Sequence, residues 1–383
     1  MSQPVYLDYN ATAPIRPEAA EAVLRALEVG GNPSSVHARG RAARNLVETA
    51  RGQVAHLVGA EPEAVTFTSG GTEANGLALE GAVASGEVLS LIVGAVEHPS
   101  VIEAATATGL PVEIWPVDGE GVADMDWLAE RLARWSPDDG VPFVALMLAN
   151  NETGVIQPVA DASRLVREAG GLLHVDAIQA AGTIEIDFAA LGADTLSLSA
   201  HKLGGPQGVG ALVAGPRSIL APRQHGGGQE RGLRAGTENV SGIAGFGAAA
   251  TAALRDLPTA GVQAAWRDAA AARLKDAGVT VAGEGAARLP NTLSIAAEDF
   301  ESSLQVMALD LDGVMVSAGS ACSSGKVRPS GVLEAMGYGP LAAGALRASG
   351  GWATTNEDWD RFAQVWLAAH QRHAARRDVR EFA

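Results

Sequence analysis

Short apolar runs alternate with segments of helical periodicity over most of this chain, and this alternation limits the folds that it can adopt. The runs Ala64–Thr68, Leu89–Gly94 and Val112–Val117 are separated by stretches with helical spacing, and the helices Arg41–Val58 and Glu73–Ala84 are predicted around them. Strands that alternate with helices form βαβ units, whose parallel strands are covered on both faces. We therefore expect an α/β domain with a mainly parallel sheet. Further strands are predicted at Phe143–Leu148, Leu172–Val175, Thr195–Ser199 and Val209–Val213.

The last third of the chain has a different pattern. An alanine-rich helix is predicted over Glu238–Leu257, and shorter mixed elements follow it. The 383 residues of the chain exceed the roughly 250–300 at which a single core stops growing. We expect a large domain of residues 16–257 and a smaller α+β domain of residues 1–15 and 258–383. Its predicted elements are helices Val262–Ala277 and Ser302–Asp310, strands Thr292–Ile295 and Val314–Ser317, and a helix from Thr355 that buries Trp359, Phe362 and Trp366.

Composition argues against several classes of function. The net charge of −16 disfavours direct binding to nucleic acid or to an anionic membrane, since both need a basic surface. No run approaches the ~18 apolar residues of a transmembrane helix, and the start MSQPVYLDYN lacks the regions of a signal peptide. One cysteine allows neither an internal disulfide nor a multi-thiolate site, and no His, Asp and Glu cluster has metal-ligand spacing. We expect a cytoplasmic protein without a bound metal.

Lysine is rare in this chain, which makes each lysine informative. Lys202 directly follows a predicted strand in LSLSAHKLGGPQG, whereas Lys275 in a polar helix face and Lys326 in a loop are typical of solvated charges. Ligands of α/β sheets gather beyond the carboxyl ends of the strands. A lysine placed there can form a Schiff base with a carbonyl cofactor, of which pyridoxal phosphate is the common one.

Pyridoxal phosphate also needs a carboxylate for its ring nitrogen. Asp176 ends a predicted strand in LLHVDAIQA, and Gln179 follows one turn later. The carboxylate could keep the ring nitrogen protonated, and the amide could bind the ring hydroxyl. Capping of a following helix is the alternative role for this aspartate.

An anion site for the phosphate is predicted in VTFTSGGTEANGLAL, where a strand leads into Gly71 and Thr72 and a helix begins. Free backbone N–H groups and the helix dipole converge at such a position. Ser199 and His201, just before the lysine, could add donors to the same phosphate, and His98 in VEHPS could stack on the ring.

Taken together, these residues give the chain a resemblance to the cysteine desulfurases, in the class V aminotransferase branch of the fold-type I pyridoxal phosphate enzymes. The resemblance implies a large domain with a mainly parallel seven-stranded sheet flanked by helices, and a homodimer. The motifs occur in family order over nearly the whole chain: YLDYNATAP (6–14), GNPSSVHARG (31–40), FTSGGTEAN (67–75), EHPS (97–100), NNETG (150–154), HVDAIQ (174–179), SLSAHKLGGPQGVGAL (197–212), HGGGQERGLRAGTENV (225–240), SAGSACSSG (317–325) and ALRASGG (345–351).

The resemblance also implies a role for each matching residue. They are Lys202 for the Schiff base, Asp176 for the ring nitrogen, Gln179 for the ring hydroxyl, His98 for the ring face and proton transfer, Gly71, Thr72, Ser199 and His201 for the phosphate, Thr237 for the phosphate of the partner subunit, and Asn151 and Arg347 for the substrate carboxylate.

The only cysteine, Cys322, lies in AGSACSSGKVRPSG (318–331), a segment of small residues that is an unusual place for a core thiol. The resemblance implies that L-cysteine becomes L-alanine while its sulfur passes to Cys322 as a persulfide. Lys326 and Arg328 depart from the family pattern, and their charge could favour the reactive thiolate.

Two other functions remain open from the sequence. A selenocysteine lyase or another class V enzyme, such as an epimerase or an aminotransferase, would share the lysine, the aspartate and the phosphate loop. A partner or scaffold subunit without turnover is the alternative outside enzymes. The sequence does not identify the sulfur acceptor, for which an iron–sulfur cluster assembly scaffold and a tRNA-thiolation protein are both candidates.

Overall fold

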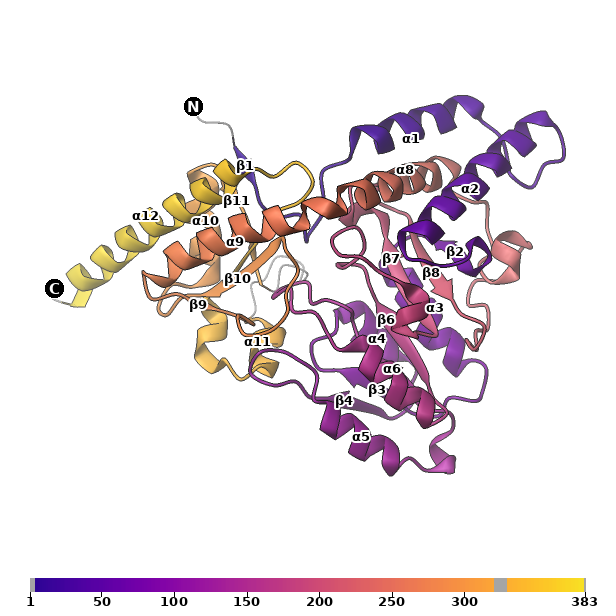
Figure 1. Ribbon diagram of the computed structural model, residues 1–383, viewed down its shortest axis with the longest axis horizontal. Helices are drawn as coiled ribbons and strands as arrows, with labels where there is room; N and C mark the ends of the chain where they lie inside the picture. The colour runs from indigo at the N-terminus through magenta and orange to yellow at the C-terminus, as the bar shows by residue number, and fades with distance from the viewer. Residues whose placement is uncertain (1–3, 320–328, 382–383) are drawn as a thin grey trace.

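A seven-stranded sheet forms the centre of the larger part of the molecule in the computed structural model, which describes residues 4–319 and 329–381 (Figure 1). The strand order is β2-β8-β7-β6-β5-β3-β4, and β8 alone runs antiparallel to its neighbours. The predicted mainly parallel sheet is confirmed. The strands are β2 (Val65–Thr68), β3 (Leu91–Gly94), β4 (Val112–Trp115), β5 (Phe143–Ala145), β6 (Leu172–Asp176), β7 (Thr195–Ser199) and β8 (Gly210–Ala214).

Helices cover both faces of this sheet, and each face has its own hydrophobic cluster. Along β3, Ile92 packs into one cluster, whereas Leu91 and Val93 pack into the other. Successive side chains of a strand point to opposite faces, so a strand buried on both faces must be apolar throughout. The helices of this part are α1 (Pro17–Val29), α2 (Ala38–Leu57), α3 (Gly71–Val83), α4 (Pro99–Ala107), α5 (Met125–Ala133), α6 (Val159–Glu168), α7 (Phe188–Leu191) and α8 (Val240–Asp256).

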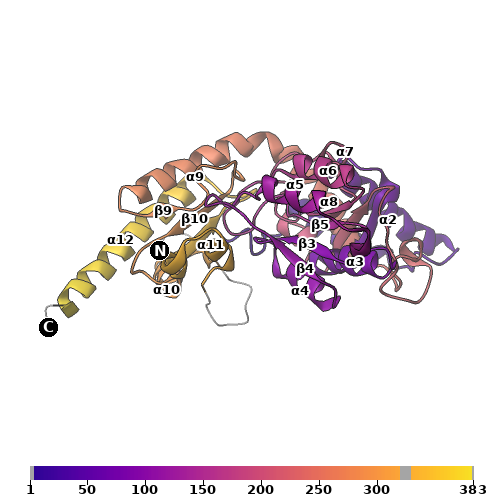
Figure 2. The same cartoon turned by 90° about the horizontal axis from the view of Figure 1, so that it is seen from below.

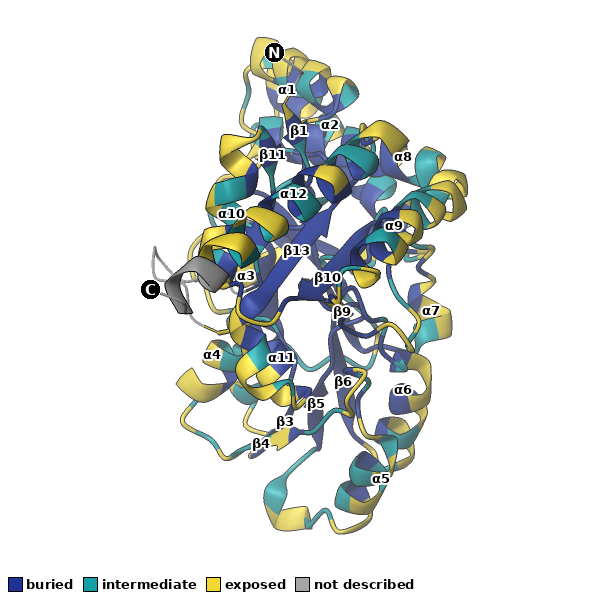
Figure 3. Cartoon of the chain, turned by 90° about the vertical axis from the view of Figure 1, so that its left-hand side faces the viewer, coloured by how far each residue is buried: buried dark blue, intermediate teal, exposed yellow. Residues whose placement is uncertain are grey.

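A second, smaller sheet lies under the C-terminal helices. Its order is β12-β13-β10-β9, with antiparallel neighbours, and its buried strands lie behind helices whose outer faces are exposed (Figure 3). Trp359, Phe362 and Trp366 are buried against it, as predicted. The elements are β9 (Thr280–Val281), β10 (Thr292–Ala296), β12 (Ser317–Ala318), β13 (Ala345–Ser349), α9 (Ala260–Lys275), α10 (Ser302–Leu311), α11 (Gly331–Ala335) and α12 (Asn356–Glu381).

The predicted strand Val314–Ser317 is wrong as a single element. The chain instead forms two short strands, β11 (Val314–Met315), which pairs in parallel with β1 (Val5–Tyr6), and β12, which pairs with β13. The apolar run does not reveal this change of sheet, because its partners lie far away in the sequence.

Two helices connect the large and the small sheet. In two perpendicular views, α8 and α9 form one arch that reaches from the first sheet to the second (Figures 1 and 2). The N-terminal segment also crosses over, since Val5 and Leu7 pack into the hydrophobic cluster of the small sheet. These contacts support the proposal that residues 16–257 form one domain and that residues 1–15 and 258–383 form the other. Within the two described ranges, no helix combines the length and the apolar character that a membrane crossing requires.

Candidate active site

A cavity of about 260 Å³ lies where the strands β6 and β7 end. Small-molecule sites typically measure roughly 300–1,000 Å³, and this cavity lies just below that range. Ala11, Ser100, Met147 and Ile178 also line it, although the sequence did not single them out. The predicted site residues that the structure brings to this cavity are Gly71, Thr72, His98, Asn151, Asp176, Gln179, Ser199, His201 and Lys202.

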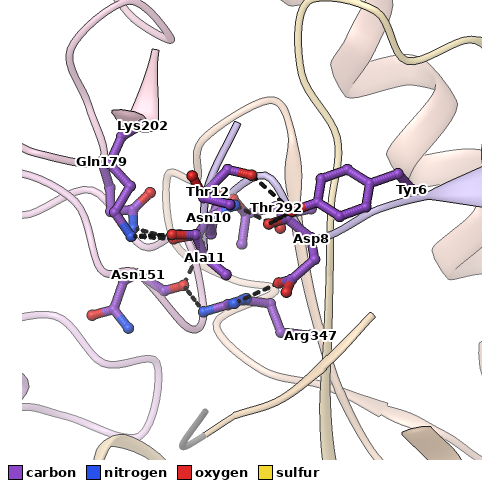
Figure 4. Close-up of polar contacts among 11 residues, drawn as sticks. Tyr6, Asp8, Asn10, Ala11, Thr12, Asn151, Gln179, Lys202, Thr292 and Arg347 are labelled. Atoms are coloured by element: carbon purple, nitrogen blue, oxygen red, sulfur yellow. Dashed lines mark hydrogen bonds and ion pairs between the residues drawn. The ribbon is translucent and has the colours of Figure 1, made fainter. Parts of the chain in front are cut away.

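The N-terminal segment forms one wall of the cavity. Lys202, in the helical turn that follows β7, donates from Nζ to the backbone oxygens of Asn10 and Ala11, and Gln179 Nε2 donates to the Asn10 oxygen at 3.0 Å (Figure 4). Asn10 is itself fixed, because its Nδ2 donates to Thr292 Oγ1 at 2.9 Å. These residues belong to the motif YLDYNATAP (6–14), whose match to the family was the signal in the sequence that could have identified them.

Asp176 supplies a buried carboxylate at the end of β6. Its Oδ1 accepts a hydrogen bond from the Ile178 N–H at 3.0 Å, and its Oδ2 accepts one from Asn75 Nδ2 at 2.8 Å. The residues after Asp176 form turns rather than a helix, so the helix-capping alternative is wrong. Burial, and then the negative charge of Asp176, hold the pKa of the nearby Glu97 well above its usual range. Glu97 also accepts a hydrogen bond from the Met147 backbone N–H through its Oε1.

His98 is held as a neutral imidazole. It precedes α4, and its Nδ1 accepts a hydrogen bond from the Ser100 backbone N–H at 3.1 Å. Burial lowers the pKa of His98, with smaller opposing effects from Asp176, which raises it, and Lys202, which lowers it. Because Nδ1 accepts, the imidazole proton lies on Nε2.

Another part of the cavity lining suits a phosphate. Gly71 and Thr72 form the first turn of α3, where backbone N–H groups are unpaired within the helix. A Cβ on Gly71 would lie 2.2 Å from Ile178 Cδ1, so a larger residue here would require the Ile178 side chain to move. Thr72 and Ser199 both line the cavity, and a hydroxyl group of either type can donate to an anion.

His201 lies beside these donors as a neutral ring. Burial lowers its pKa to about 4, with Lys202 as the second cause. The backbone amides, hydroxyls and imidazole therefore fit the phosphate of pyridoxal phosphate, while Asp176 and Lys202 fit its ring nitrogen and its aldehyde.

The small sheet contributes Arg347 from β13. Its Nη1 donates to the Asn151 backbone oxygen at 3.0 Å, and its Nη2 pairs with Asp8 Oδ1 at 2.8 Å (Figure 4). The Arg347 side chain is buried, and its Nε has no hydrogen-bond partner in the described part of the chain. A buried guanidinium with unused donor capacity fits a substrate carboxylate.

Arg347 contacts the backbone of the lining residue Asn151 without lining the cavity itself, and two further predicted site residues do not line it. Thr237 lines a separate cavity with Phe67, Thr68 and Gly208, so its proposed contact with a phosphate depends on a second subunit. Cys322, together with Lys326 and Arg328, lies outside the described residues.

His174 is a buried histidine of β6 that the sequence analysis did not single out. Burial lowers its pKa to about 3, whereas an unfolded chain has a histidine pKa near ~6.5. Below pH ~6.5 the unfolded state then binds more protons, so the stability that depends on neutral His174 is lost as the pH falls toward the folded-state value.

A His174→Gln variant should therefore lose less stability on acidification than the wild type. Between pH 7.5 and pH 5, we expect the wild type to lose about 2 kcal/mol more unfolding free energy than His174→Gln, as measured by urea unfolding. The exposed His56→Gln is the control and should follow the wild type. A parallel pH dependence of His174→Gln and wild type would contradict this assignment.

Comparison with known proteins agrees with this geometry. The class V aminotransferase family model matches residues 5–362. A cysteine desulfurase of Frankia sp. is 42% identical, covering 92% of this chain and 88% of the relative, and one of Cereibacter sphaeroides is 43% identical, covering 94% of each. Among solved structures, the NifS-like protein of Rickettsia africae superposes with a TM-score of 0.88 at 32% identity, covering 96% of this chain and all of that one (100%).

The site and these matches define a fold-type I enzyme. The chain belongs to the class V aminotransferase family and, within it, to the cysteine desulfurases. A further structural neighbour, SspA in complex with cysteine, is 29% identical with a TM-score of 0.76, covering 90% of this chain and 98% of that one.

Proposed function

We propose that the protein converts L-cysteine to L-alanine with pyridoxal phosphate bound in the cavity, and that Cys322 receives the sulfur as a persulfide. The observation that supports this most is the presence of Lys202, Asp176 and His98 around one cavity, part of whose lining suits a phosphate. The named activity of the relatives and the cysteine bound to the neighbour SspA point to the same substrate.

Different residues of the cavity would bind different parts of the cofactor. Gly71 and Thr72, with Ser199 and His201, would hold the phosphate, and Asp176 would hold the ring nitrogen. When bound, pyridoxal phosphate supplies an electron sink for the bonds at the substrate α-carbon. Gln179 would hold the ring hydroxyl.

Proton transfer and substrate binding fall to four other side chains. Lys202 would take the proton from the substrate α-carbon, because it lines the cavity and its amine is a base once it no longer binds the aldehyde. His98, neutral and protonated on Nε2, would stack on the ring and donate or receive a proton at that atom. Arg347 and Asn151 would hold the substrate carboxylate at the edge of the cavity.

Cys322 would perform the sulfur transfer. Its thiolate would form a new S–S bond to the substrate sulfur while the substrate C–S bond breaks. The electron pair of that bond passes to the carbon skeleton, which takes a proton and leaves as alanine. Cys322 then carries the sulfur as a persulfide.

The setting of the enzyme is also part of the proposal. A homodimer would bring Thr237 of one subunit to the phosphate of the other. We place the protein in the cytoplasm, with a sulfur acceptor that is either an iron–sulfur scaffold or a tRNA-thiolation protein. Both the acceptor and the dimer rest on the resemblance to the family.

Incubation of the cofactor-loaded protein with L-cysteine tests the proposal. We expect alanine as a product, together with sulfide when a thiol reductant is added to cleave the persulfide. Intact-mass analysis without reductant should find one added sulfur on Cys322, the only cysteine of the chain. Cys322→Ala should form no persulfide. Equal alanine production by Cys322→Ala, or faster turnover of selenocysteine that does not need Cys322, would favour a different class V activity.

A further inference from the structure

A buried hydrogen-bond network joins the two sides of the cavity. Its centre is Asn75 on α3, which is fully buried and does not itself line the cavity. Asn75 Nδ2 donates to Asp176 Oδ2 at 2.8 Å and to Ser100 Oγ at 2.9 Å, and Asn75 Oδ1 lies 3.0 Å from His174 Nε2. One amide thus contacts the carboxylate directly and reaches His98 through a single serine.

The direction of each hydrogen bond follows from Asp176. An ionised carboxylate only accepts, so the nitrogen of the Asn75 amide must face it and the oxygen must point away. That oxygen then requires a donor, which is the Nε2–H of His174. The other His174 nitrogen, Nδ1, accepts from Thr195 Oγ1 at 2.9 Å. The low pKa of about 3 that burial gives His174 keeps this ring neutral.

The same reasoning extends to His98. Because Asn75 donates to Ser100 Oγ, the serine hydroxyl hydrogen is directed toward His98 Nδ1, which lies 2.8 Å away. The Ser100 backbone N–H also donates to this nitrogen, at 3.1 Å. A ring nitrogen that accepts from two donors does not carry the proton, so the orientation of Asn75 supports the Nε2–H form of His98.

We propose that Asn75 is a positioning residue. It orients the Asp176 carboxylate directly and, through Ser100, keeps the proton of His98 on Nε2. Its significance for the reaction rests on the proposed function, but its hydrogen bonds belong to the protein itself. The titratable groups that act on His98 are Asp176 and Lys202, and Glu97, whose pKa is raised by burial and then by Asp176, lies near Asp176. Asn75 donates to both Asp176 and Ser100 from the same amide nitrogen.

The variant Asn75→Leu tests this inference, since leucine has a similar size and no hydrogen-bonding group. In the cofactor-free protein, nitrogen NMR of labelled histidines should show a higher pKa of His98, because its neutral form loses support from Ser100. In the loaded protein, the absorption band of pyridoxal phosphate should titrate differently, because Asp176 has lost a donor. We expect kcat to fall roughly tenfold with little change in KM.

Three further variants separate positioning from a general loss of packing. Ser100→Ala should raise the pKa of His98 and leave the cofactor band unchanged. His174→Gln retains an N–H for Asn75 Oδ1 and should keep the wild-type signals, whereas His174→Leu should resemble Asn75→Leu. Gln157→Leu is the matched control, because Gln157 is another buried amide that both donates, to the Gly121 oxygen, and accepts, from the Ala123 N–H.

Unchanged His98 signals in both Asn75→Leu and Ser100→Ala would overturn the inference, as would equal changes in Gln157→Leu. The Ser100→Ala measurement decides the question if Asn75→Leu does not fold. If the NMR changes occur as predicted but the protein has no desulfurase activity, the proposed function is refuted. The hydrogen-bond assignment of Asn75 then still holds.

Discussion

The Lys202→Ala variant is expected to form alanine from L-cysteine at least about a thousandfold more slowly than the wild type. Lys202 is the only lysine that lines the described cavity, and alanine can neither bind the aldehyde of the cofactor nor move a proton. Positioned acid–base groups contribute roughly 10²–10⁴-fold to a reaction rate, and the loss of the covalent attachment adds to this effect.

Alanine release and borohydride reduction measure the two consequences separately. Reduction should add the mass of the cofactor to the wild type and not to Lys202→Ala. The matched control is Lys275→Ala, because Lys275 forms an exposed pair with Glu284 at 2.7 Å and lies on α9, away from the cavity. Wild-type turnover by Lys202→Ala, or cofactor mass on it after reduction, would refute the assignment.

Replacement of Asp176 by asparagine is expected to lower kcat by roughly two to four orders of magnitude. A neutral amide would leave the protonated ring nitrogen buried without its partner, and removal of one member of a buried ion pair costs about 3–5 kcal/mol. The ring would then lose its proton. Asparagine also has one acceptor oxygen for the two donors that bind Asp176, the Ile178 N–H and Asn75 Nδ2.

Asp194→Asn is the control for this substitution. Asp194 is a buried aspartate that also accepts a backbone hydrogen bond, from the Leu173 N–H at 2.9 Å, and it does not line the cavity. This control is expected to lose stability and to keep its kcat, measured under conditions where the protein is folded. A similar kcat for Asp176→Asn and Asp194→Asn would contradict the role of Asp176.

The sequence predicted the large sheet well because its strands other than the edge strand β4 are almost entirely buried. The strand Thr195–Ser199 is found with the predicted limits, and Ala64–Thr68 is shorter by one residue than predicted. Burial on both faces produces apolar runs that are visible without knowledge of the fold. The split of Val314–Ser317 between two sheets was missed because the pairing with Val5 and Tyr6 spans most of the chain.

At the site, too, local sequence patterns identified some residues, and contacts between distant segments revealed the others. Lys202, Asp176 and His98 were identified because each follows a recognisable strand, and parallel strands end at a common edge. Asn75 and Asp8 were not assigned roles, since their neighbours along the chain do not indicate which distant groups they contact. Their importance follows from hydrogen bonds to Asp176 and Arg347.

The sequence by itself therefore determined the α/β class, the family and the residues whose chemistry a pyridoxal phosphate enzyme needs. Periodicity and local motifs contain this information, because both depend on neighbours along the chain. Only the tertiary structure decided that Asn10 and Ala11 form a wall beside Lys202, that Asp8 pairs with Arg347, and that Asn75 links Asp176 to Ser100 and so to His98. These contacts join residues that are far apart in the sequence. Their donors and acceptors meet only in the folded chain, so local sequence patterns cannot predict which groups form hydrogen bonds.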